Sequence, residues 1–269
     1  SVAIGGPAPP TCVRRACVGA RARVCGGIND GGGGGHRECG RCACAHAGAP
    51  RVPAVVAQVE ATAGAPAFLL LDYLAPAPPR PDFDARLGRG LAALHAQTAE
   101  AFGFAHDNWC GATLQPNAWS PDWPTFFRER RLGWQLRLAA EGGAKATDLR
   151  PIEHLLDRLD DLLAADAEPP ALVHGDLWSG NLLCVGEGEP ALIDPAAYYG
   201  HREAELGMML LFGGFSPRVY AAYERVRPLQ PGWRDRVPLY TLYHVLNHHN
   251  LFGGGYLGQA RAIARRYVG

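Results

Sequence analysis

The sequence predicts an α+β protein with two lobes, a small β-rich N-terminal lobe at residues 1–74 and a large, mainly helical C-terminal lobe at residues 75–269. Apolar runs before residue 75 are short and strand-like, whereas most of those after it recur at helical spacing. A proline-rich connector, residues 75–81, lies between the two kinds of pattern. Because a single hydrophobic core usually stops growing near about 250 to 300 residues, 269 residues suit two lobes around a cleft.

In the N-terminal lobe, two apolar runs, Arg51 to Val56 and Ala67 to Leu74, have the length and composition of short buried strands. Residues 1–50 show neither strand nor helix periodicity and include an unbroken run of glycines, Gly31 to Gly35. Glycine loses more backbone entropy on folding than any other residue, so such a run resists regular structure. We therefore expect residues 1–46 to be an aberrant segment ahead of the two strands.

In the C-terminal lobe, the period of the apolar residues changes twice along the chain. A helical period runs through most of residues 84–165, gives way to brief apolar runs separated by Gly, Asp and Pro, and returns near residue 202. Pro124 suits the first turn of one helix, which Gly142 and Gly143 would end. The expected helices are 84–101, 124–141, 148–165, 202–212, 217–225, 239–249 and 256–267, and the expected strands are 171–173, 182–185 and 191–193.

The charge balance narrows the class of partner. The 26 basic residues equal the 26 acidic ones, so bulk electrostatics favours neither nucleic acid nor an anionic membrane as a partner. No apolar run approaches the roughly 18 residues that span a bilayer, and Ser1 to Pro10 lacks the basic and apolar parts of a secretory signal. We expect a cytoplasmic protein that acts on a small molecule.

The cysteines are concentrated at the N-terminal end, where six of the eight lie in the first 44 residues. Cys39, Cys42 and Cys44, with His36 and His46 nearby, offer zinc-ligand chemistry, but a structural zinc site normally joins two separated ligand pairs. A disulfide framework needs an oxidising compartment, for which the sequence has no secretory signal. Reduced thiols in a poorly patterned segment are therefore the favoured interpretation.

The strongest functional pattern begins at His174-Gly175-Asp176 and continues with Asn181 and Asp194, which follow Asp176 by 5 and 18 positions. Each of these oxygen-bearing side chains lies beside a short apolar run, so each is expected in a loop at a strand end. His-Gly-Asp alone is also an ordinary turn. The positions of Asn181 and Asp194 relative to Asp176 favour a functional site over an ordinary turn. In such a site His174 would have a structural role and brace the loop.

This set of residues matches what phosphoryl transfer from ATP requires. The reaction passes through a loose transition state, so a protein mainly positions the reactants and neutralises charge. One carboxylate orients the attacking hydroxyl and accepts its proton, while a carboxylate and an amide oxygen hold magnesium, which prefers oxygen ligands. The order and spacing are those of protein kinases. They predict Asp176 as the catalytic base and Asn181 and Asp194 as magnesium ligands.

Longer strings around this centre resemble the fructosamine kinase (ketosamine 3-kinase) family, whose members are related to aminoglycoside phosphotransferases and have a protein-kinase-like fold. The resemblance covers about residues 51–269, and its length favours this family over the aminoglycoside and choline phosphotransferases, which share only the His-Gly-Asp motif and the metal aspartate. The strings are Asp107-Asn108, Gln115-Pro116-Asn117, Trp119, Asp122-Trp123, Phe126-Phe127, residues 194–206, residues 211–215 and residues 243–256.

The resemblance implies transfer of the ATP γ-phosphate to the C3 hydroxyl of a fructosamine or ribulosamine, free or linked to protein, which would serve deglycation. ATP and Mg²⁺ are the implied cofactors. By the same resemblance, Asp72, Tyr73 and Leu74 form the hinge that meets adenine, although a strand ending in these residues is unremarkable by itself. Trp178 and His248 line the sugar site, or else serve only in packing.

The N-terminal lobe departs from the kinase pattern. Gly26, Gly27 and Asn29 resemble the family's glycine-rich turn, and Glu38 falls near the expected helix glutamate, but no lysine that would contact the phosphates lies between them. The single lysine of the chain, Lys145, lies between two expected helices and is predicted to be a solvated surface residue. Two interpretations follow, a catalytically impaired pseudokinase or ligand-binding protein of the same fold, or a disrupted translation of the first 45 or so residues.

Overall fold

The structure is a computed structural model of the chain and describes residues 48–268, except for 60, 65 and 164–167. It has the mixture of helices and small antiparallel sheets that was expected of an α+β protein. The expectations for residues 1–46, which include the glycine-rich turn at Gly26, Gly27 and Asn29 and the six N-terminal cysteines, lie outside the described residues.

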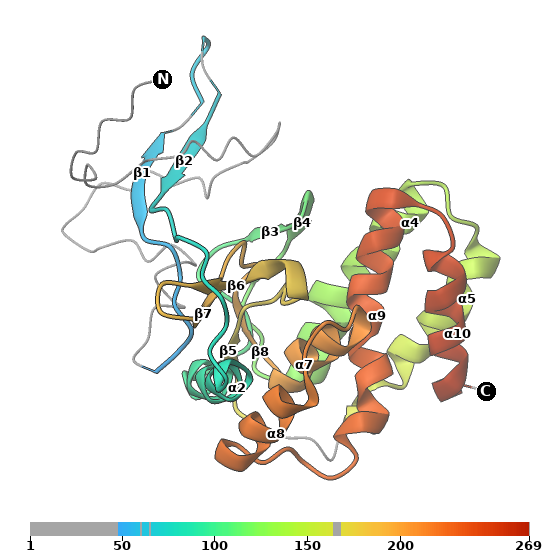
Figure 1. Cartoon of the computed structure of the whole chain (residues 1–269). Helices are drawn as coiled ribbons and strands as arrows, with labels where there is room; N and C mark the ends of the chain where they lie inside the picture. The colour runs from blue at the N-terminus through green and yellow to red at the C-terminus, as the bar shows by residue number, and fades with distance from the viewer. Residues whose placement is uncertain (1–47, 60, 65, 164–167, 269) are drawn as a thin grey trace, which may run out of the picture.

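The first described strands form a hairpin that projects from one end of the molecule, away from helices α4, α5, α9 and α10 (Figure 1, blue). Strands β1 (Val55–Val59) and β2 (Phe68–Leu71) pair antiparallel. The prediction of a strand over 51–56 was wrong at its start, since Pro53 has no amide to donate to a ladder. Arg51 instead pairs in parallel with Ala191, through amide bonds of 3.1 and 2.8 Å.

Two further strand pairs carry the loops of interest. Strand β5 (Ala171–Val173) pairs with β8 (Tyr198–Gly200), and β6 (Leu182–Val185) forms a hairpin with β7 (Glu189–Leu192). The strands expected over 171–173 and 182–185 are confirmed at both ends, and the strand expected over 191–193 is confirmed within two residues. Strand β8 was not predicted, because three residues with a terminal glycine carry no period that sequence reasoning can detect.

Helix α2 (Phe83–Leu94) packs on α8 (Pro217–Val226). The prediction that the first helix runs to residue 101 was wrong, because the chain leaves the helix at His95 to pair with β5, where the amide of Leu172 donates to Gln97 O at 2.8 Å. Gly88 lets the two helices approach, since a Cβ atom there would lie 2.2 Å from Val219 O.

The middle of the chain forms a continuous helical run through α3 (Trp123–Phe126), a π-helical segment (Phe127–Leu132) and α4 (Gly133–Glu141), which confirms the helix expected from Pro124 to Gly142. The helix expected over 148–165 is divided into α5 (Ala146–Asp157) and α6 (Leu159–Leu163). Before the π-helical run, β3 (Asn108–Cys110) and β4 (Thr113–Gln115) form a hairpin that was not predicted.

The last helices are α7 (Arg202–Leu211), α9 (Trp233–Phe252) and α10 (Tyr256–Val268). The bounds expected for α7, α8 and α10 are confirmed within one residue, but α9 is longer than the predicted 239–249. Residues 239–247 of α9 are all buried, so this part of the helix has no polar face. Without an amphipathic pattern, the sequence does not indicate where the helix begins and ends.

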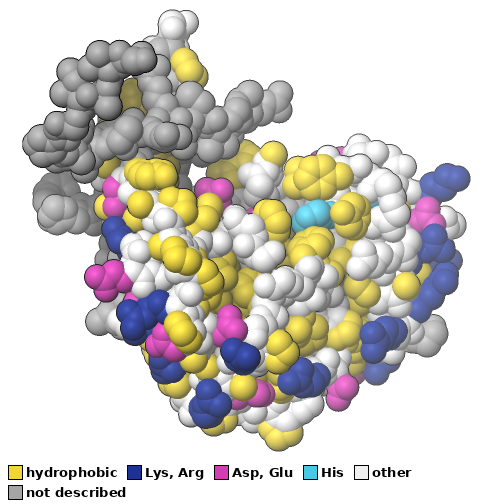
Figure 2. Space-filling view, viewed as in Figure 1, with side chains coloured by type: hydrophobic (Ala, Val, Ile, Leu, Met, Phe, Trp, Pro, Cys, Tyr) yellow, Lys and Arg dark blue, Asp and Glu magenta, His cyan; other side chains and the backbone are white. Residues whose placement is uncertain are grey.

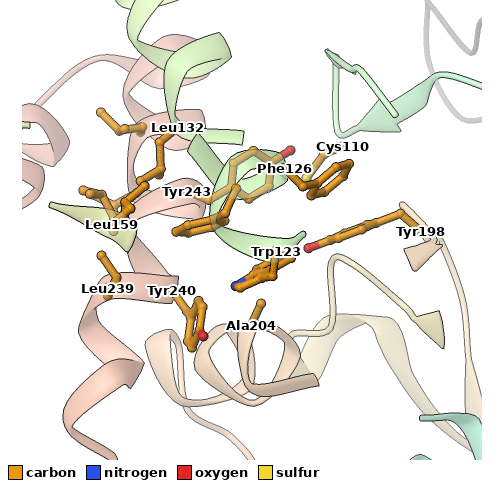
Figure 3. Packing of buried hydrophobic residues seen from close by; sticks show 14 of the residues in the cluster. Cys110, Trp123, Phe126, Leu132, Leu159, Tyr198, Ala204, Leu239, Tyr240 and Tyr243 are labelled. Atoms are coloured by element: carbon orange, nitrogen blue, oxygen red, sulfur yellow. The ribbon is translucent and has the colours of Figure 1, made fainter. Parts of the chain in front are cut away.

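The main core is aromatic and lies between the π-helical region, α7 and α9. Trp123 stacks on Phe127 with 5.1 Å between ring centroids and also contacts the Tyr240 ring at 6.1 Å. Figure 3 shows this packing, with Tyr198 and Cys110 at one end of the cluster. At that end Cys110 lies within 4.8 Å of Asp176, and the Tyr198 ring would lie 3.3 Å from a Cβ atom on Gly175, so the core packs against the loop after β5.

Candidate active site

The loop after β5 and the loop before β8 lie against each other because the two strands pair. Val173 is opposite Tyr198 in the register, and the amide of Ala196 donates to His174 O at 2.9 Å. Gly175 has a positive φ of 84°, and a Cβ atom there would lie 2.1 Å from Ala196 O. Only glycine therefore permits this close approach of the two loops.

His174 braces the loop, as expected. Its Nε2 makes a 2.9 Å hydrogen bond with Ile193 O, and its Nδ1 accepts the amide of Asp176 at 3.3 Å. The side chain is fully buried, and burial lowers its pKa, so the ring is neutral near pH 7. His174 thus ties the residue after β7 to the loop that carries Asp176.

Glu205 on α7 holds the same loop from the opposite side, a role that sequence reasoning missed. Its carboxylate accepts the amides of His174 at 2.5 Å and Gly175 at 3.1 Å. The side chain is fully buried, 3.7 Å from the His95 ring. Burial alone would raise its pKa, but the interactions with His95 and then with His174 outweigh it, so the pKa is lowered and the group is ionised.

Asp176 lies at the tip of the braced loop and is mostly buried. Burial raises its pKa to about 7, and the negative charges of Glu205 and Asp194 act in the same direction. A carboxylate whose pKa lies near the working pH is well suited to accept a proton. The surroundings therefore fit the role of base that the sequence predicts.

Asn181 and Asp194 lie at the same end of the β6–β7 hairpin, one before β6 and the other after β7. The amide of Ile193 donates to Asn181 O at 3.0 Å, and Asn181 Nδ2 donates to Asp176 O at 2.8 Å. Because Nδ2 is committed to the loop, the amide oxygen is the side-chain atom of Asn181 that is left for a cation. The pairing thus brings both predicted ligand residues beside the loop of Asp176.

Asp194 is exposed and has a φ of 52°, the only positive value for a non-glycine among the described residues. Aspartate tolerates this conformation better than most residues, and such strain gathers at functional sites. A carboxylate together with the amide oxygen of Asn181 is the hard oxygen donor set that suits magnesium. The two residues therefore fit the predicted metal.

The predicted hinge, Asp72 to Leu74, directly follows β2. It lies where the β1–β2 hairpin joins the rest of the described chain. Leu74 is buried, whereas Tyr73 is exposed, and Asp72 lies 3.8 Å from Arg51. The connector beyond it runs along β6, where Ala77 N donates to Cys184 O at 2.9 Å. This position agrees with a hinge, and contact with adenine stays a prediction.

Trp178 lies two residues from Asp176, and its side chain is exposed. Its ring covers Gly180, where a Cβ atom would lie 2.2 Å from the indole. The loop after α7 lies alongside, since a Cβ atom on Gly214 would be 2.7 Å from Ser179. Trp178 is thus a surface aromatic at the rim of the candidate site.

His248 belongs to an aromatic group at the end of α9. Its ring lies 5.0 Å from Phe212, 5.5 Å from Phe252 and 5.3 Å from Tyr256, centroid to centroid. Phe212 and Phe252 are exposed, so the group forms part of the surface. On the face shown in Figure 2, hydrophobic side chains are spread over the described surface, whereas most basic side chains lie at its lower and lateral margins.

A buried polar network supports the loop after Asp194 from behind, and it explains the Gln115-Pro116-Asn117 string. Gln115 Nε2 donates to Ala196 O at 2.9 Å, and Asn108 Nδ2 donates to Ala197 O at 2.7 Å. The Tyr243 hydroxyl donates to Gln115 Oε1 at 2.8 Å. The β3–β4 hairpin and α9 thus fix the backbone that leads from Asp194 into β8.

A family model described as "Fructosamine kinase" matches residues 42–269. A probable ketoamine kinase of Vibrio parahaemolyticus is 45% identical over 204 residues, which cover 75% of this chain and 69% of the relative. A chloroplastic protein-ribulosamine 3-kinase of Oryza sativa subsp. indica is 41% identical over 203 residues, which cover 75% of this chain and 59% of the relative.

Solved structures agree with the fold. The crystal structure of a "putative fructosamine-3-kinase" of Thermobifida fusca has a TM-score of 0.75 and 41% identity, and the match covers 83% of this chain and 75% of that one. The structure of an aminoglycoside phosphotransferase, APH(4)-Ia, has a TM-score of 0.54 and 20% identity, and the match covers 84% of this chain and 80% of that one. At this identity the similarity shows the fold alone. The expected two-lobe, kinase-like α+β fold is confirmed. In the described part of the chain, no helix is both long and apolar enough to cross a membrane.

Proposed function

Because the chain belongs to the fructosamine kinase family, we propose that it transfers the γ-phosphate of ATP to the C3 hydroxyl of a fructosamine or ribulosamine. The observation that carries the proposal is the arrangement of one loop and one hairpin. Asp176 is bonded through its backbone to Asn181, and Asp194 lies at the same hairpin end. Phosphorylation at C3 would destabilise the sugar adduct and free the amine, so deglycation is the proposed outcome.

Each residue has a separate part in the proposed reaction. Asp176 accepts the proton of the attacking hydroxyl and orients its oxygen toward the transferred phosphorus. Asn181 and Asp194 would hold magnesium, which when bound supplies positive charge to the ATP phosphates. Trp178 and His248 would position the sugar, and Asp72, Tyr73 and Leu74 would meet the adenine.

Replacement of Asp176 by Asn tests the assignment of the base. We expect Asp176→Asn to lower kcat for ribulose-lysine or fructose-lysine by about 10²- to 10⁴-fold, the usual contribution of a positioned general base. ADP release in a coupled assay measures this. Asp161→Asn is the matched control, because that carboxylate is 80% exposed on α6, and it should keep the wild-type rate. Equal rates for wild type and Asp176→Asn would refute the assignment.

A second candidate function is that of a nucleotide-binding protein with weak or lost catalysis. The observation that favours it is that the sequence has a single lysine, Lys145, which is far along the chain from the β1–β2 hairpin. Lys145 is exposed just before α5, as predicted. Thermal unfolding with Mg·ATP separates the cases, since any ligand that binds the native state raises the midpoint. A raised midpoint without ketosamine turnover supports the second function, and turnover supports the first.

A further inference from the structure

Three side chains from distant parts of the chain form a cluster around the carboxylate of Asp176. Cys110 ends β3, Asp176 follows β5, and His244 lies within α9. One potential ligand atom from each lies within 4.8 Å of the other two. Within the part of the chain that the structure describes, no other group of three or more such side chains comes as close. The cluster shares only Asp176 with the proposed phosphotransfer machinery.

The donors of this cluster differ from the predicted magnesium ligands. A thiolate, an imidazole and a carboxylate are the ligand types that bind zinc, which accepts three protein ligands and leaves a fourth position open. Zinc lies about 2.0 to 2.3 Å from such atoms, so ligand atoms in a tetrahedral site are about 3.5 Å apart. Small side-chain movements would bring the three ligand atoms from separations of up to 4.8 Å to the spacing of a tetrahedral zinc site.

His244 provides an independent indication of a ligand. Only 5% of the residue is exposed, and its Nδ1 is buried without a hydrogen-bond partner among the described residues. A buried polar atom without a partner costs free energy, and coordination to a cation would remove that cost. The backbone oxygen of His244 accepts a hydrogen bond from His248 Nδ1 at 2.7 Å, which leaves the ring of His244 itself without this partner.

The sulfur of Cys110 is also held in place. Asn247 Nδ2 contacts Cys110 Sγ at 3.5 Å and Cys110 O at 3.4 Å from the next turn of α9. Figure 3 shows Cys110 at the end of the aromatic cluster that contains Tyr243 and Tyr198. Outer groups that orient a ligand in this way strengthen metal binding. Asp176 is the least buried of the three and opens the cluster toward the candidate site.

We propose that Cys110, Asp176 and His244 bind a zinc ion, and that zinc binding excludes catalysis because it occupies the carboxylate that receives the substrate proton. Binding forms a sulfur–zinc bond and releases the thiol proton of Cys110 to solvent. The inhibitory part rests on the proposed function. The binding part does not, because it needs no turnover.

Cobalt is a spectroscopic probe for the binding part, used with the full chain without nucleotide. We expect wild type to show thiolate-to-cobalt absorption and to bind one more equivalent of cobalt per chain than Cys110→Val or His244→Gln. Cys184→Val is the matched control, since Cys184 is the other described cysteine and lies outside the cluster, and it should behave as wild type. The N-terminal cysteines are common to all four proteins and cancel in the comparison.

Cys110→Ser is a second variant that is expected to fold normally, because serine is similar in size to cysteine. It removes the sulfur that would bind the metal. Its thermal midpoint without metal should match that of wild type, and its cobalt stoichiometry should be one lower. Equal stoichiometry and equal charge-transfer absorption in wild type, Cys110→Ser and His244→Gln would overturn the proposed site.

Zinc inhibition of phosphorylation tests the second part in the presence of excess magnesium. We expect the zinc concentration for half inhibition to rise at least about tenfold in Cys110→Ser, as for the loss of a group that supports a metal site. A chelator should restore the wild-type rate. Equal sensitivity of the two proteins would overturn the inhibitory role. If wild type phosphorylates no ketosamine, the proposed function fails, and the cobalt measurement still decides the site.

Discussion

At the scale of single residues, the loop that presents Asp176 is held mainly by atoms that have no catalytic part. Glu205 accepts two successive amides of the loop, and His174 joins it to Ile193 O. Hydrogen bonds to an ionised group contribute more than neutral ones, about 1.5 to 3 kcal/mol each. A buried carboxylate on a helix therefore holds the loop that carries the proposed base.

Glu205→Gln should lower both stability and turnover. The neutral amide keeps one acceptor oxygen for two loop amides, so we expect a loss of about 1 to 3 kcal/mol in the free energy of unfolding. Because the loop is then less well held, kcat should fall more than KM rises. Urea unfolding and steady-state kinetics measure these effects, with the exposed Glu153→Gln of α5 as the control. Unchanged stability and kcat would contradict the bracing role.

The same group makes stability depend on pH in a defined direction. The pKa of Glu205 is lowered in the folded protein, so its ionised form stabilises the fold above the unfolded value of 4.5, and this contribution is lost as the pH falls below it. The difference in unfolding free energy between wild type and Glu205→Gln should therefore narrow in acid. A gap that stays constant from neutral to acid pH would show that ionisation of Glu205 contributes nothing.

At the scale of elements, close packing between helices depends on small residues at particular contacts. Gly88 of α2 faces the backbone of α8. Gly88→Ala should destabilise the protein by about 1 to 3 kcal/mol, the usual cost of overpacking, because the new methyl group has no room. Gly258→Ala is the matched control, since Gly258 has open space around it in α10, and alanine should stabilise that helix by up to about 1 kcal/mol. Thermal unfolding distinguishes the opposite signs.

At the scale of the whole molecule, α7 and α9 connect the two sides of the candidate site. Helix α7 carries Glu205, and α9 carries His244 and His248. The two helices are joined by Arg236 and Glu203, whose paired hydrogen bonds measure 2.7 and 2.8 Å. Glu203 is fully buried, so this ion pair fixes how the loop of Asp176 faces α9.

Arg236→Gln should destabilise the whole fold by about 3 to 5 kcal/mol, since it leaves the carboxylate of Glu203 buried with weaker compensation. The double variant Arg236→Gln with Glu203→Gln should recover part of this loss, because the uncompensated charge is removed. Urea unfolding of the two single variants and the double variant measures the coupling. Strictly additive losses would show that the pair does not couple the helices.

The sequence by itself determined the order and chemistry of the proposed site. Asp176 and Asn181 share the segment between β5 and β6, the β6–β7 hairpin separates them from Asp194, and this spacing along the chain carries the kinase pattern. The same holds for α7, α8 and α10, whose periods and caps are local signals within one helix. Each of these features depends on neighbours a few residues away, which is why local patterns were sufficient.

Only the tertiary structure decided which groups meet. Glu205 contacts a backbone about 30 residues earlier, and Asn247 reaches Cys110 across 137 residues. The end of α2 and the whole of β8 likewise depend on pairing with β5, a partner far away in the sequence. Contacts of this kind arise from packing and backbone pairing between distant segments. The pattern of a single segment carries no trace of them, because its residue types would suit many other partners equally well.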